Sequence, residues 1–305
     1  MPEPTPLIDP TNDRDAWLRA RRSALGASDS AAVCGLSPWS SALSVWLDKR
    51  GLVPPTPMTP QQRWGLLLEP AVAAEFELNY PTLGVRPSPG WVVSPDCPWM
   101  GCTPDRLIDG GVLELKTSRT SEGWGPDGSA EVPEHYLVQV QHQMFVTNTR
   151  RAFLAALIGG SDFRTYEVAR HEGLIERLLA VGGHFWREHV EPGDPPAPDW
   201  SHPRTPELVE LLHRPDPARP PLTWGDAEAA LADEYARLGA RIGEADRERK
   251  GIRARLVERL AGSPSASLPD GRTVIHAERA RAGYVVDPTT FTELRIKNPR
   301  KPRGE

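Results

Sequence analysis

The stretch "GCTPDRLIDGGVLELKTS", residues 101–118, decides the fold because it combines the pattern of a buried β-strand with charges that such a strand normally excludes. Asp109-Gly110-Gly111 separates two apolar runs and is a strong signal for a β-hairpin. Asp105, Glu114 and Lys116 lie in the same stretch, and a buried charge is costly unless it is paired, hydrogen-bonded or bound to a metal. The stretch therefore predicts a hairpin whose charges have partners or a chemical task. The apolar residues that would suit a buried sheet are Ile108, Val112, Leu113 and Leu115.

The predicted hairpin brings three charged side chains into a small volume. Glu114 and Lys116 are two residues apart, so they point to the same face of one strand. Asp105 lies on the preceding strand, across the turn. Two carboxylates with carbonyl and water oxygens suit Mg²⁺ or Mn²⁺, and a lysine beside the ion can assist the attacking water. The motif is short and degenerate, so a cross-strand salt bridge on an exposed hairpin remains an alternative.

Two helical patterns offer further side chains to such a site. Glu69 lies in "LLLEPAVAAEFE", which is otherwise apolar on that side, and it can supply a third carboxylate. In the pattern at 132–147, Tyr136, Gln139 and Gln143 fall at i, i+3 and i+7 and share one face. That face predicts a helix lining a cleft and donating hydrogen bonds to phosphate or water, with a merely solvated face as the alternative.

A second group of residues has the character of an anion site. Arg21 and Ser28 bracket the end of one predicted helix and the start of the next. An arginine fork together with a serine at a helix N-terminus suits a phosphate. Trp39 and Trp124 fall in predicted loops, where they could stack on DNA bases or be placed there incidentally.

The composition permits a folded protein with a substantial core. Of the 305 residues, 39% are hydrophobic and 25% are charged, which excludes a globally disordered chain. The net charge of −5 does not by itself indicate a nucleic-acid-binding protein, nor does it exclude one that recruits divalent cations. Three cysteines without a CxxC pair argue against a zinc or four-cysteine iron–sulfur site. No apolar run is long enough to span a membrane and the N-terminus lacks a signal-peptide pattern, so a cytoplasmic location is expected.

The order of the patterns predicts a mixed α/β sheet packed by helices. Helical patterns at 13–24 and 59–80 come first, and Pro70 is expected to kink or restart the second. A three-strand meander ending at residue 118, the helix at 132–147, two more strands and a helix at about 171–190 follow.

The chain is expected to divide into three parts. We assign residues 1–195 to the α/β domain and residues 196–225, which are rich in proline, to a linker or arm. Residues 226–305 are expected to form a helical extension with a short β pair and a basic tail. In the extension, apolar residues recur at alternating spacings of three and four with a gap at Arg249. This spacing indicates either a coiled-coil-like seam or an amphipathic helix lying on its own domain.

Several motifs, taken together, resemble a known family. They are "LGASDSAAVCGLSPWSSALSVWLDKRG", "WGLLLEPAVAAEF", "PWMGCTPDRLIDGGVLELKTS", "VPEHYLVQVQHQMFV" and "LIGGSDFRTYEV". Their order and the ExK spacing resemble the YqaJ-type viral recombinases, relatives of the phage lambda exonuclease in the PD-(D/E)xK nuclease superfamily, over roughly residues 15–200. The resemblance implies a PD-(D/E)xK core and a metal-dependent 5′→3′ exonuclease that acts on double-stranded DNA ends and leaves 3′ overhangs for recombination.

The resemblance also implies roles for individual residues. Asp105 and Glu114 would bind Mg²⁺ or Mn²⁺ with the Leu115 carbonyl, Lys116 would assist the water, and Glu69 matches the upstream helical glutamate. The remaining matches are Tyr136 and Gln139 with the family's Tyr-x-x-Gln, and Arg21 and Ser28 with the phosphate-binding start of the fold. Gln143 is not part of these matches, and its expected contact with DNA or a phosphate rests on the helix face that it shares with Tyr136 and Gln139.

The resemblance further implies partners. Relatives act with a single-strand annealing protein in the bacterial cytoplasm, and some form toroidal trimers. Two other functions remain open from the residues: an endonuclease of restriction or repair type with the same chemistry, and a non-catalytic DNA-binding scaffold for recombination.

Overall fold

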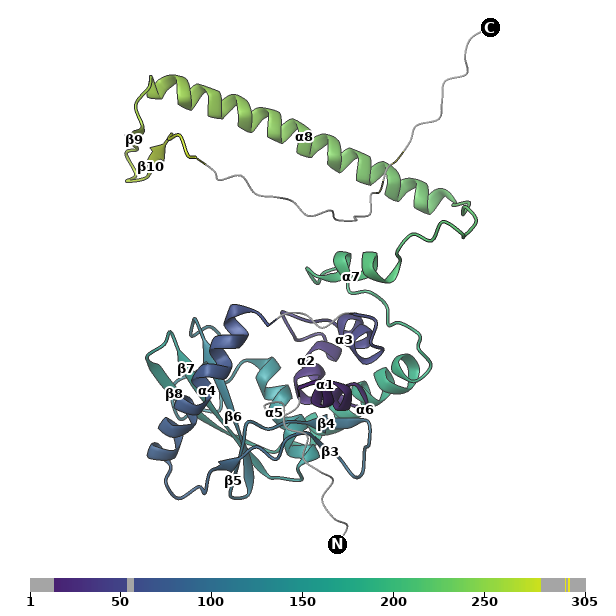
Figure 1. Cartoon of the computed structure of the whole chain (residues 1–305), viewed down its shortest axis with the longest axis vertical. Coiled ribbons are helices and arrows are strands. Elements are labelled where there is room, and N and C mark those ends of the chain that lie inside the picture. The colour runs from purple at the N-terminus through teal and green to yellow at the C-terminus, as the bar shows by residue number, and fades with distance from the viewer. Residues whose placement is uncertain (1–13, 54–57, 281–293, 295, 297–305) are drawn as a thin grey trace. The chain divides into compact units, whose positions relative to one another are not determined.

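The computed structural model describes residues 14–53, 58–280, 294 and 296 of the chain (Figure 1). The chain divides into two compact units, one ending at His213 and one beginning at Arg214, and each is described by itself. The expected division at residues 195 and 225 stays a prediction. No helix in the described part of the chain is long and apolar enough to cross a membrane.

A mixed five-stranded sheet forms the centre of the first unit, with strand order β2-β5-β6-β7-β8. The central pair β6 and β7 is parallel, and the other neighbours are antiparallel. The parallel pair requires a crossover between them, and the helix α5 provides it. The strands are β2 (Arg86–Pro87), β5 (Arg106–Ile108), β6 (Gly111–Ser118), β7 (Arg151–Ile158) and β8 (Asp162–Ala169).

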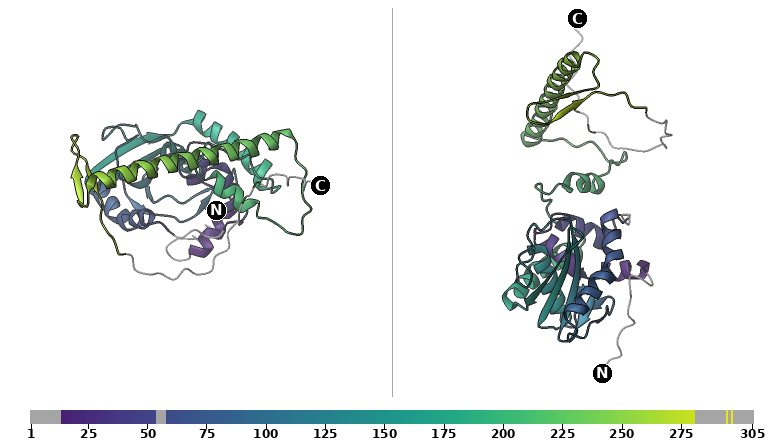
Figure 2. Two further views of the ribbon diagram at one scale, coloured as in Figure 1. Left: turned by 90° about the horizontal axis from the view of Figure 1, so that it is seen from above. Right: turned by 90° about the vertical axis from the view of Figure 1, so that its left-hand side faces the viewer.

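Helices cover both faces of this sheet, as the right-hand view of Figure 2 shows. Helix α4 (Pro60–Asn79) packs on one face, where Leu113 and Leu115 join an apolar cluster with Val72 and Phe76. Helix α5 (Glu134–Val146) packs on the opposite face, where Val112 joins a second cluster with Val140 and Met144. Alternation along β6 therefore sends Leu113 and Leu115 toward α4, and Glu114 and Lys116 toward α5. The predicted α/β class, a mixed central sheet flanked by helices, is confirmed.

The predicted meander differs from the structure at its first two strands. Residues Met100–Cys102 form β4, which pairs with β1 (Leu25–Gly26) and β3 (Val92–Val93) in a separate three-stranded sheet. The chain then leaves this sheet and β5 begins at Arg106 in the main sheet. Pro104 stands between the two strands and has no backbone N–H for a ladder, so one continuous strand is interrupted there.

Short helices pack around the second sheet. Buried Leu25, Trp46 and Phe185 belong to one apolar cluster that joins the N-terminal helices to α6. The helices are α1 (Arg14–Arg22), α2 (Ala27–Val33), α3 (Ala42–Lys49), α6 (Glu172–Phe185) and the π-helical turn η1 (Trp186–Val190). Helix α4 runs from Pro60 to Asn79 as one helix with Pro70 inside it, so the proline does not restart the helix as one alternative had it.

Part of the stretch expected to be a linker is regular and packed. Residues Thr205–Leu212 form α7, with Pro206 in its first turn, where a missing N–H costs nothing. Leu208 is buried in the same cluster as Trp46, which ties this helix to the first unit. Burial of the apolar side of α7 thus stabilises a helix in a segment whose many prolines had suggested irregular structure.

The second unit contains a long helix and a short β pair. Helix α8 spans Asp226–Leu260, and β9 (Ser265–Ser267) pairs antiparallel with β10 (Thr273–Ile275). Both elements agree with the predicted extension. The predicted basic tail lies outside the described residues except for Leu294 and Ile296.

Candidate active site

The hairpin of β5 and β6 places Asp105 beside Glu114. Arg106 pairs with Leu113 across the hairpin, so the next pair along the same register is Asp105 with Glu114. At this point the regular ladder ends, and the Asp105 Oδ2 atom accepts a hydrogen bond of 2.7 Å from the backbone N–H of Leu115. The aspartate side chain thus takes the position of a neighbouring strand, and the turn at Gly110, which has a φ of 73°, makes the hairpin tight.

The same geometry turns a backbone oxygen toward Asp105. In a strand, the N–H and C=O groups of one residue point to the same edge. The Leu115 N–H bonds the Asp105 carboxylate, so the Leu115 carbonyl also points to that edge. Its side chain lies with α4, and only its backbone takes part in this region.

Glu114 is 2% exposed, and three donors surround its carboxylate. The Oε1 atom accepts from Lys116 Nζ at 2.5 Å and from Gln139 Nε2 at 2.6 Å. The Oε2 atom accepts from Gln143 Nε2 at 2.6 Å. A buried carboxylate with charge-assisted hydrogen bonds on both oxygens is tolerated in a sheet. This arrangement explains how the quoted stretch carries charge in a buried strand.

Lys116 is held as a cation at the edge of the site. Burial lowers its pKa, but the Glu114 and Asp105 carboxylates outweigh burial and raise the pKa above the ordinary value. The ammonium also lies 4.8 Å from the centre of the Tyr136 ring, which favours a cation. Tyr136 in turn packs against Trp124, with ring centres 5.4 Å apart.

Asp105 is the carboxyl group of the site whose pKa is raised. Burial and the neighbouring Glu114 carboxylate raise its pKa well above the ordinary value, and Lys116 only partly opposes them. The two carboxylates therefore repel each other in the absence of a further positive charge. A divalent cation is the ligand that would remove this repulsion.

Glu69 lies near this group but has a different partner. Its Oε1 atom forms an ion pair of 2.9 Å with Arg106 Nη1, which also donates to the Asp105 carbonyl at 2.5 Å. The sequence patterns did not single out Arg106. The sequence did contain a signal for this residue, because Arg106 is a charged residue between Asp105 and the apolar residues Leu107 and Ile108 of the same strand.

The donor set fits a hard cation with few protein ligands. Within the part of the chain that the structure describes, no group of three or more His, Cys, Asp or Glu side chains could hold a metal ion. Asp105, Glu114 and the Leu115 carbonyl supply two carboxylates and one backbone oxygen. Mg²⁺ is commonly held by one or two carboxylates and keeps several waters, so these residues fit the ion.

Arg21 and Ser28 come together as expected, but within a network of charges. Arg21 Nη2 donates to Ser28 Oγ at 3.2 Å and pairs with Asp29 at 3.0 Å. Lys49, whose side chain is fully buried, pairs with the other Asp29 oxygen at 2.6 Å. Burial raises the pKa of Asp29, but Lys49 and Arg21 outweigh it and hold the pKa well below the ordinary value. Two cations share one carboxylate, so the three side chains together carry one net positive charge.

A tryptophan links this network to the hairpin. The Arg21 guanidinium lies 4.8 Å from the centre of the Trp17 ring. Trp17 Nε1 donates to Thr103 Oγ1 at 3.1 Å, two residues before Asp105.

Of the two tryptophans considered for base stacking, the structure exposes one. Trp124 lies in a loop as expected but is buried in the cluster beneath the sheet, which leaves incidental placement and not base stacking for this residue. The Trp124 ring packs between the rings of Tyr136 and Tyr166, so the side chain is buried although its backbone lies in a loop. Trp39 is exposed and lies edge-on to His135.

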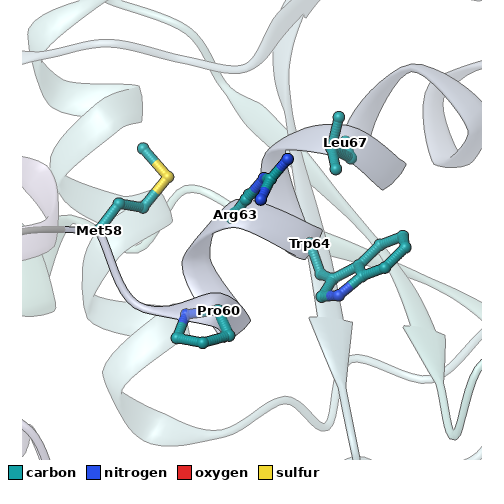
Figure 3. Close-up of a pocket in the computed structure, with 5 residues that line it drawn as sticks. All are labelled: Met58, Pro60, Arg63, Trp64 and Leu67. Carbon is teal, nitrogen blue, oxygen red and sulfur yellow. The ribbon is translucent and has the colours of Figure 1, made fainter.

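An apolar hollow lies near the end of β6. It has a volume of about 340 Å³ and Figure 3 shows the side chains around it. Gly65 follows Trp64 of this lining, and a Cβ atom added to Gly65 would lie 3.7 Å from Thr117 Oγ1. This turn of α4 therefore lies beside Thr117, the residue that follows Lys116 in β6. The lining residues are Met58, Pro60, Arg63, Trp64 and Leu67.

Comparison with known proteins shows what the segment around this site is similar to. Residues 16–150 match the YqaJ-like viral recombinase domain, and this segment contains the hairpin and the whole of α5. This part of the chain is therefore similar to the YqaJ-like viral recombinase domain. The uncharacterized protein YqaJ of Bacillus subtilis (strain 168) is 36% identical over 195 residues, which cover 62% of this chain and 60% of that protein. The chain thus spans about three-fifths of the length of this curated relative.

Solved exonuclease structures show more distant similarity. LHK-Exo from Laribacter hongkongensis, an alkaline exonuclease solved in complex with dAMP, is 19% identical with a TM-score of 0.46, covering 57% of this chain and 91% of that one. A phage-related exonuclease from Haemophilus somnus 129PT is 12% identical with a TM-score of 0.40, covering 56% of this chain and 96% of that one.

Proposed function

We propose that this protein is a Mg²⁺- or Mn²⁺-dependent exonuclease that degrades one strand of double-stranded DNA from the 5′ end and leaves 3′ overhangs for recombination. The observation that carries the proposal is the buried Glu114 carboxylate beside Asp105 and Lys116 in a YqaJ-like domain. A structural salt bridge would need only one carboxylate for one lysine. The second, repelled carboxylate suits a site that takes up a cation.

The residues of the chain have separate tasks in this proposal. Asp105, Glu114 and the Leu115 carbonyl would hold the ion, which supplies a polarised water and offsets phosphate charge. Gln139 and Gln143 fix the Glu114 carboxylate from α5, so that its orientation does not depend on the ion.

Lys116 keeps a proton beside the two carboxylates. It can donate a hydrogen bond from Nζ to a phosphate oxygen or to the attacking water. The adjacent Tyr136 ring limits the directions that this ammonium can take.

In this proposal, the Arg21 network sets the direction of degradation because it binds the 5′ end of the DNA. A terminal 5′-phosphate can accept from the Arg21 guanidinium and from Ser28 Oγ, which already face each other at 3.2 Å. The planar guanidinium matches two phosphate oxygens. We further propose that the product is passed to a single-strand annealing protein and that the reaction takes place in the bacterial cytoplasm.

The test compares DNA forms and ends. Linear duplexes labelled at the 5′ or 3′ terminus and a covalently closed circular duplex are incubated with Mg²⁺, with Mn²⁺ and with EDTA. We expect early release of the 5′ label from linear DNA, an intact circle and no reaction in EDTA. Cleavage of the circle would assign an endonuclease instead, and DNA binding without cleavage in either metal would assign a scaffold protein.

A further inference from the structure

The Trp39 indole is an exposed aromatic surface near the candidate site, and the proposed function does not use it. The side chain is 59% exposed and lies in the short loop between α2 and α3. A single exposed apolar side chain is common on folded proteins and needs no task. Two further observations distinguish Trp39 from such a case, and they concern its backbone and its ring contacts.

The loop that carries Trp39 is held at both ends. At its start, the Leu36 N–H donates to the Ala31 carbonyl at 2.8 Å, directly after the last turn of α2. At its end, the Ser41 side chain caps α3. Pro38, with its fixed φ, comes immediately before the tryptophan. The backbone therefore presents the indole at a defined place while most of the side chain faces solvent.

Ring contacts connect Trp39 to the cation of the candidate site. The Trp39 ring lies edge-on to His135 with ring centres 4.8 Å apart, and its centre is 6.3 Å from that of the Tyr136 ring. The Lys116 ammonium lies 4.8 Å from the centre of the same Tyr136 ring. One aromatic ring therefore separates the exposed indole from the ammonium that pairs with Glu114.

His135 orients the indole without covering it. The His135 Nε2 atom is buried and has no hydrogen-bond partner among the described residues, so this ring contacts Trp39 by packing. The edge-on arrangement is a favoured geometry for aromatic pairs. In such a pair at least one face of each ring stays uncovered by the other, which leaves an indole face open to a flat ligand.

The proposed reaction supplies a flat ligand at this place. Glu114 is 2% exposed, so its carboxylate lies below the protein surface. A phosphate approaches such a group with least obstruction when its nucleotide has left the duplex. The base of that nucleotide then loses its stacking partner, and an aromatic side chain can replace the partner because every base has a π-face.

We propose that Trp39 stacks on an unpaired base of the strand being degraded, and that this base belongs to one of the two nucleotides joined by the cleaved linkage. The inference rests on the proposed nuclease function and adds a substrate-binding residue to it. An indole face contacts bases of every sequence, because it reads no hydrogen-bonding group. His135 is a positioning residue in this arrangement.

The first experiment removes the bases from the substrate. Single-turnover release of the 5′-terminal nucleotide is measured at subsaturating enzyme on three linear duplexes. One is intact, one has abasic sugars on both sides of the cleaved linkage, and one has two abasic sugars further inside. Weaker pairing at abasic sugars affects every protein alike, so only the ratio of wild-type to variant rate is compared.

We expect Trp39→Ala to react about tenfold more slowly than the wild type on the intact duplex and on the duplex modified further inside, the scale of one stacked base. On the duplex without the flanking bases the two proteins should react equally fast, because the indole has no base to contact. The same loss on all three duplexes, or no loss on the intact one, would overturn the proposal.

Two further variants control this comparison. Trp39→Phe keeps an aromatic face and should retain most of the wild-type rate. Trp224→Ala removes an indole of the second unit that is 68% exposed, and it should behave as the wild type does on all three duplexes. A Trp224→Ala variant with the same base-dependent loss would contradict the assignment to Trp39.

The second experiment requires no cleavage. 2-Aminopurine, whose fluorescence is quenched by stacking, replaces either base at the linkage, in separate duplexes, and binding is followed in EDTA. At one of these positions we expect lower emission in the wild-type complex than in the Trp39→Ala complex. Equal emission from both complexes at both positions would reject the stacking. Quenching that depends on Trp39, without cleavage in Mg²⁺ or Mn²⁺, would instead reject the nuclease activity and support the stacking contact.

Discussion

Glu114 is held by three hydrogen-bond donors within the sheet, and it is also the residue on which the proposed reaction depends most. Glu114→Gln removes the charge but keeps the size of the side chain. We expect cleavage of linear DNA to be abolished and Mg²⁺ binding to weaken, because a metal ligand becomes a neutral amide. DNA binding in EDTA should change little.

The measurements for this variant are nucleotide release at saturating Mg²⁺ and isothermal titration of Mg²⁺ into the protein. Circular dichroism before and after the titration shows whether the variant is folded. Cleavage retained at saturating Mg²⁺ would exclude Asp105 and Glu114 as the metal site.

Lys116 provides a second test at the same scale. Its pKa is raised by the two carboxylates, so it acts in the proposal as a proton-bearing cation and not as a metal ligand. Lys116→Ala should lower turnover by about 10²–10⁴-fold, the scale of general acid–base assistance, while Mg²⁺ affinity changes little. Single-turnover cleavage and Mg²⁺ titration separate these effects. A variant that is fully active, or one that fails to bind Mg²⁺, contradicts the assigned role.

Among the elements, α5 joins the candidate site to the rest of the domain. Gln139 and Gln143 face Glu114, while His142 on another side of the helix is buried against α2 and β4. His142 Nε2 bonds the Gly101 carbonyl at 3.1 Å, which can only accept, so Nε2 carries the proton. Nδ1 then accepts from Ser30 Oγ at 2.6 Å, and the ring is neutral in the folded protein.

This histidine predicts a loss of stability in mild acid. Burial lowers the pKa of His142 from 6.5 to about 4. The unfolded chain therefore binds a proton between these pH values that the folded chain does not, and stability falls as the pH drops through this window. Between pH 7 and pH 5 the contribution is about 2 kcal/mol from one histidine shifted by this amount.

Urea unfolding at pH 7 and pH 5 checks this expectation. His142→Gln retains donor and acceptor groups but does not titrate, so it should lose less stability between the two pH values than the wild type. His184→Gln, on the more exposed surface of α6, is the matched control and should behave as the wild type does. An equal loss in wild type and His142→Gln would show that other groups cause the acid sensitivity.

At the scale of the whole molecule, the proposed exonuclease requires the Arg21 network near the N-terminus to act together with the hairpin of β5 and β6. These two regions are far apart in the chain, and the hydrogen bond from Trp17 to Thr103, 86 residues away, connects them. Arg21→Ala should remove the preference for 5′-phosphorylated over 5′-hydroxyl ends. The fold should persist, because Asp29 keeps its ion pair with Lys49.

The measurement is the initial rate of digestion on duplexes that differ only in the 5′ group. Arg19→Ala, on the exposed side of the same helix, is the control and should keep the preference. A wild type that treats both ends alike, or an Arg21→Ala variant that keeps the preference, would reject the pocket.

Local patterns in the sequence determined the hairpin, the two faces of β6 and the polar face of α5. These features follow from repeats of two and 3.6 residues and from the Asp-Gly-Gly turn, all of which depend on neighbours in the chain. The local patterns place Glu114 and Lys116 on one face of a strand, and Gln139 and Gln143 on one face of a helix. The packing of α5 on β6 then brings the two faces together. The spacing of three and four residues between the apolar positions of α8 is local in the same sense as these patterns.

Only the tertiary structure decided which partners the charges have. Glu69 was expected beside the metal, and the structure pairs it with Arg106 from a strand 37 residues away. Arg21 was expected to be free for a phosphate, and the structure places Asp29 and buried Lys49 beside it. The split of the predicted strand into β4 and β5 and the burial of Trp124 have the same origin. Each depends on segments distant in the chain meeting in space, and the choice among oppositely charged partners is made by burial and distance, which no local repeat encodes.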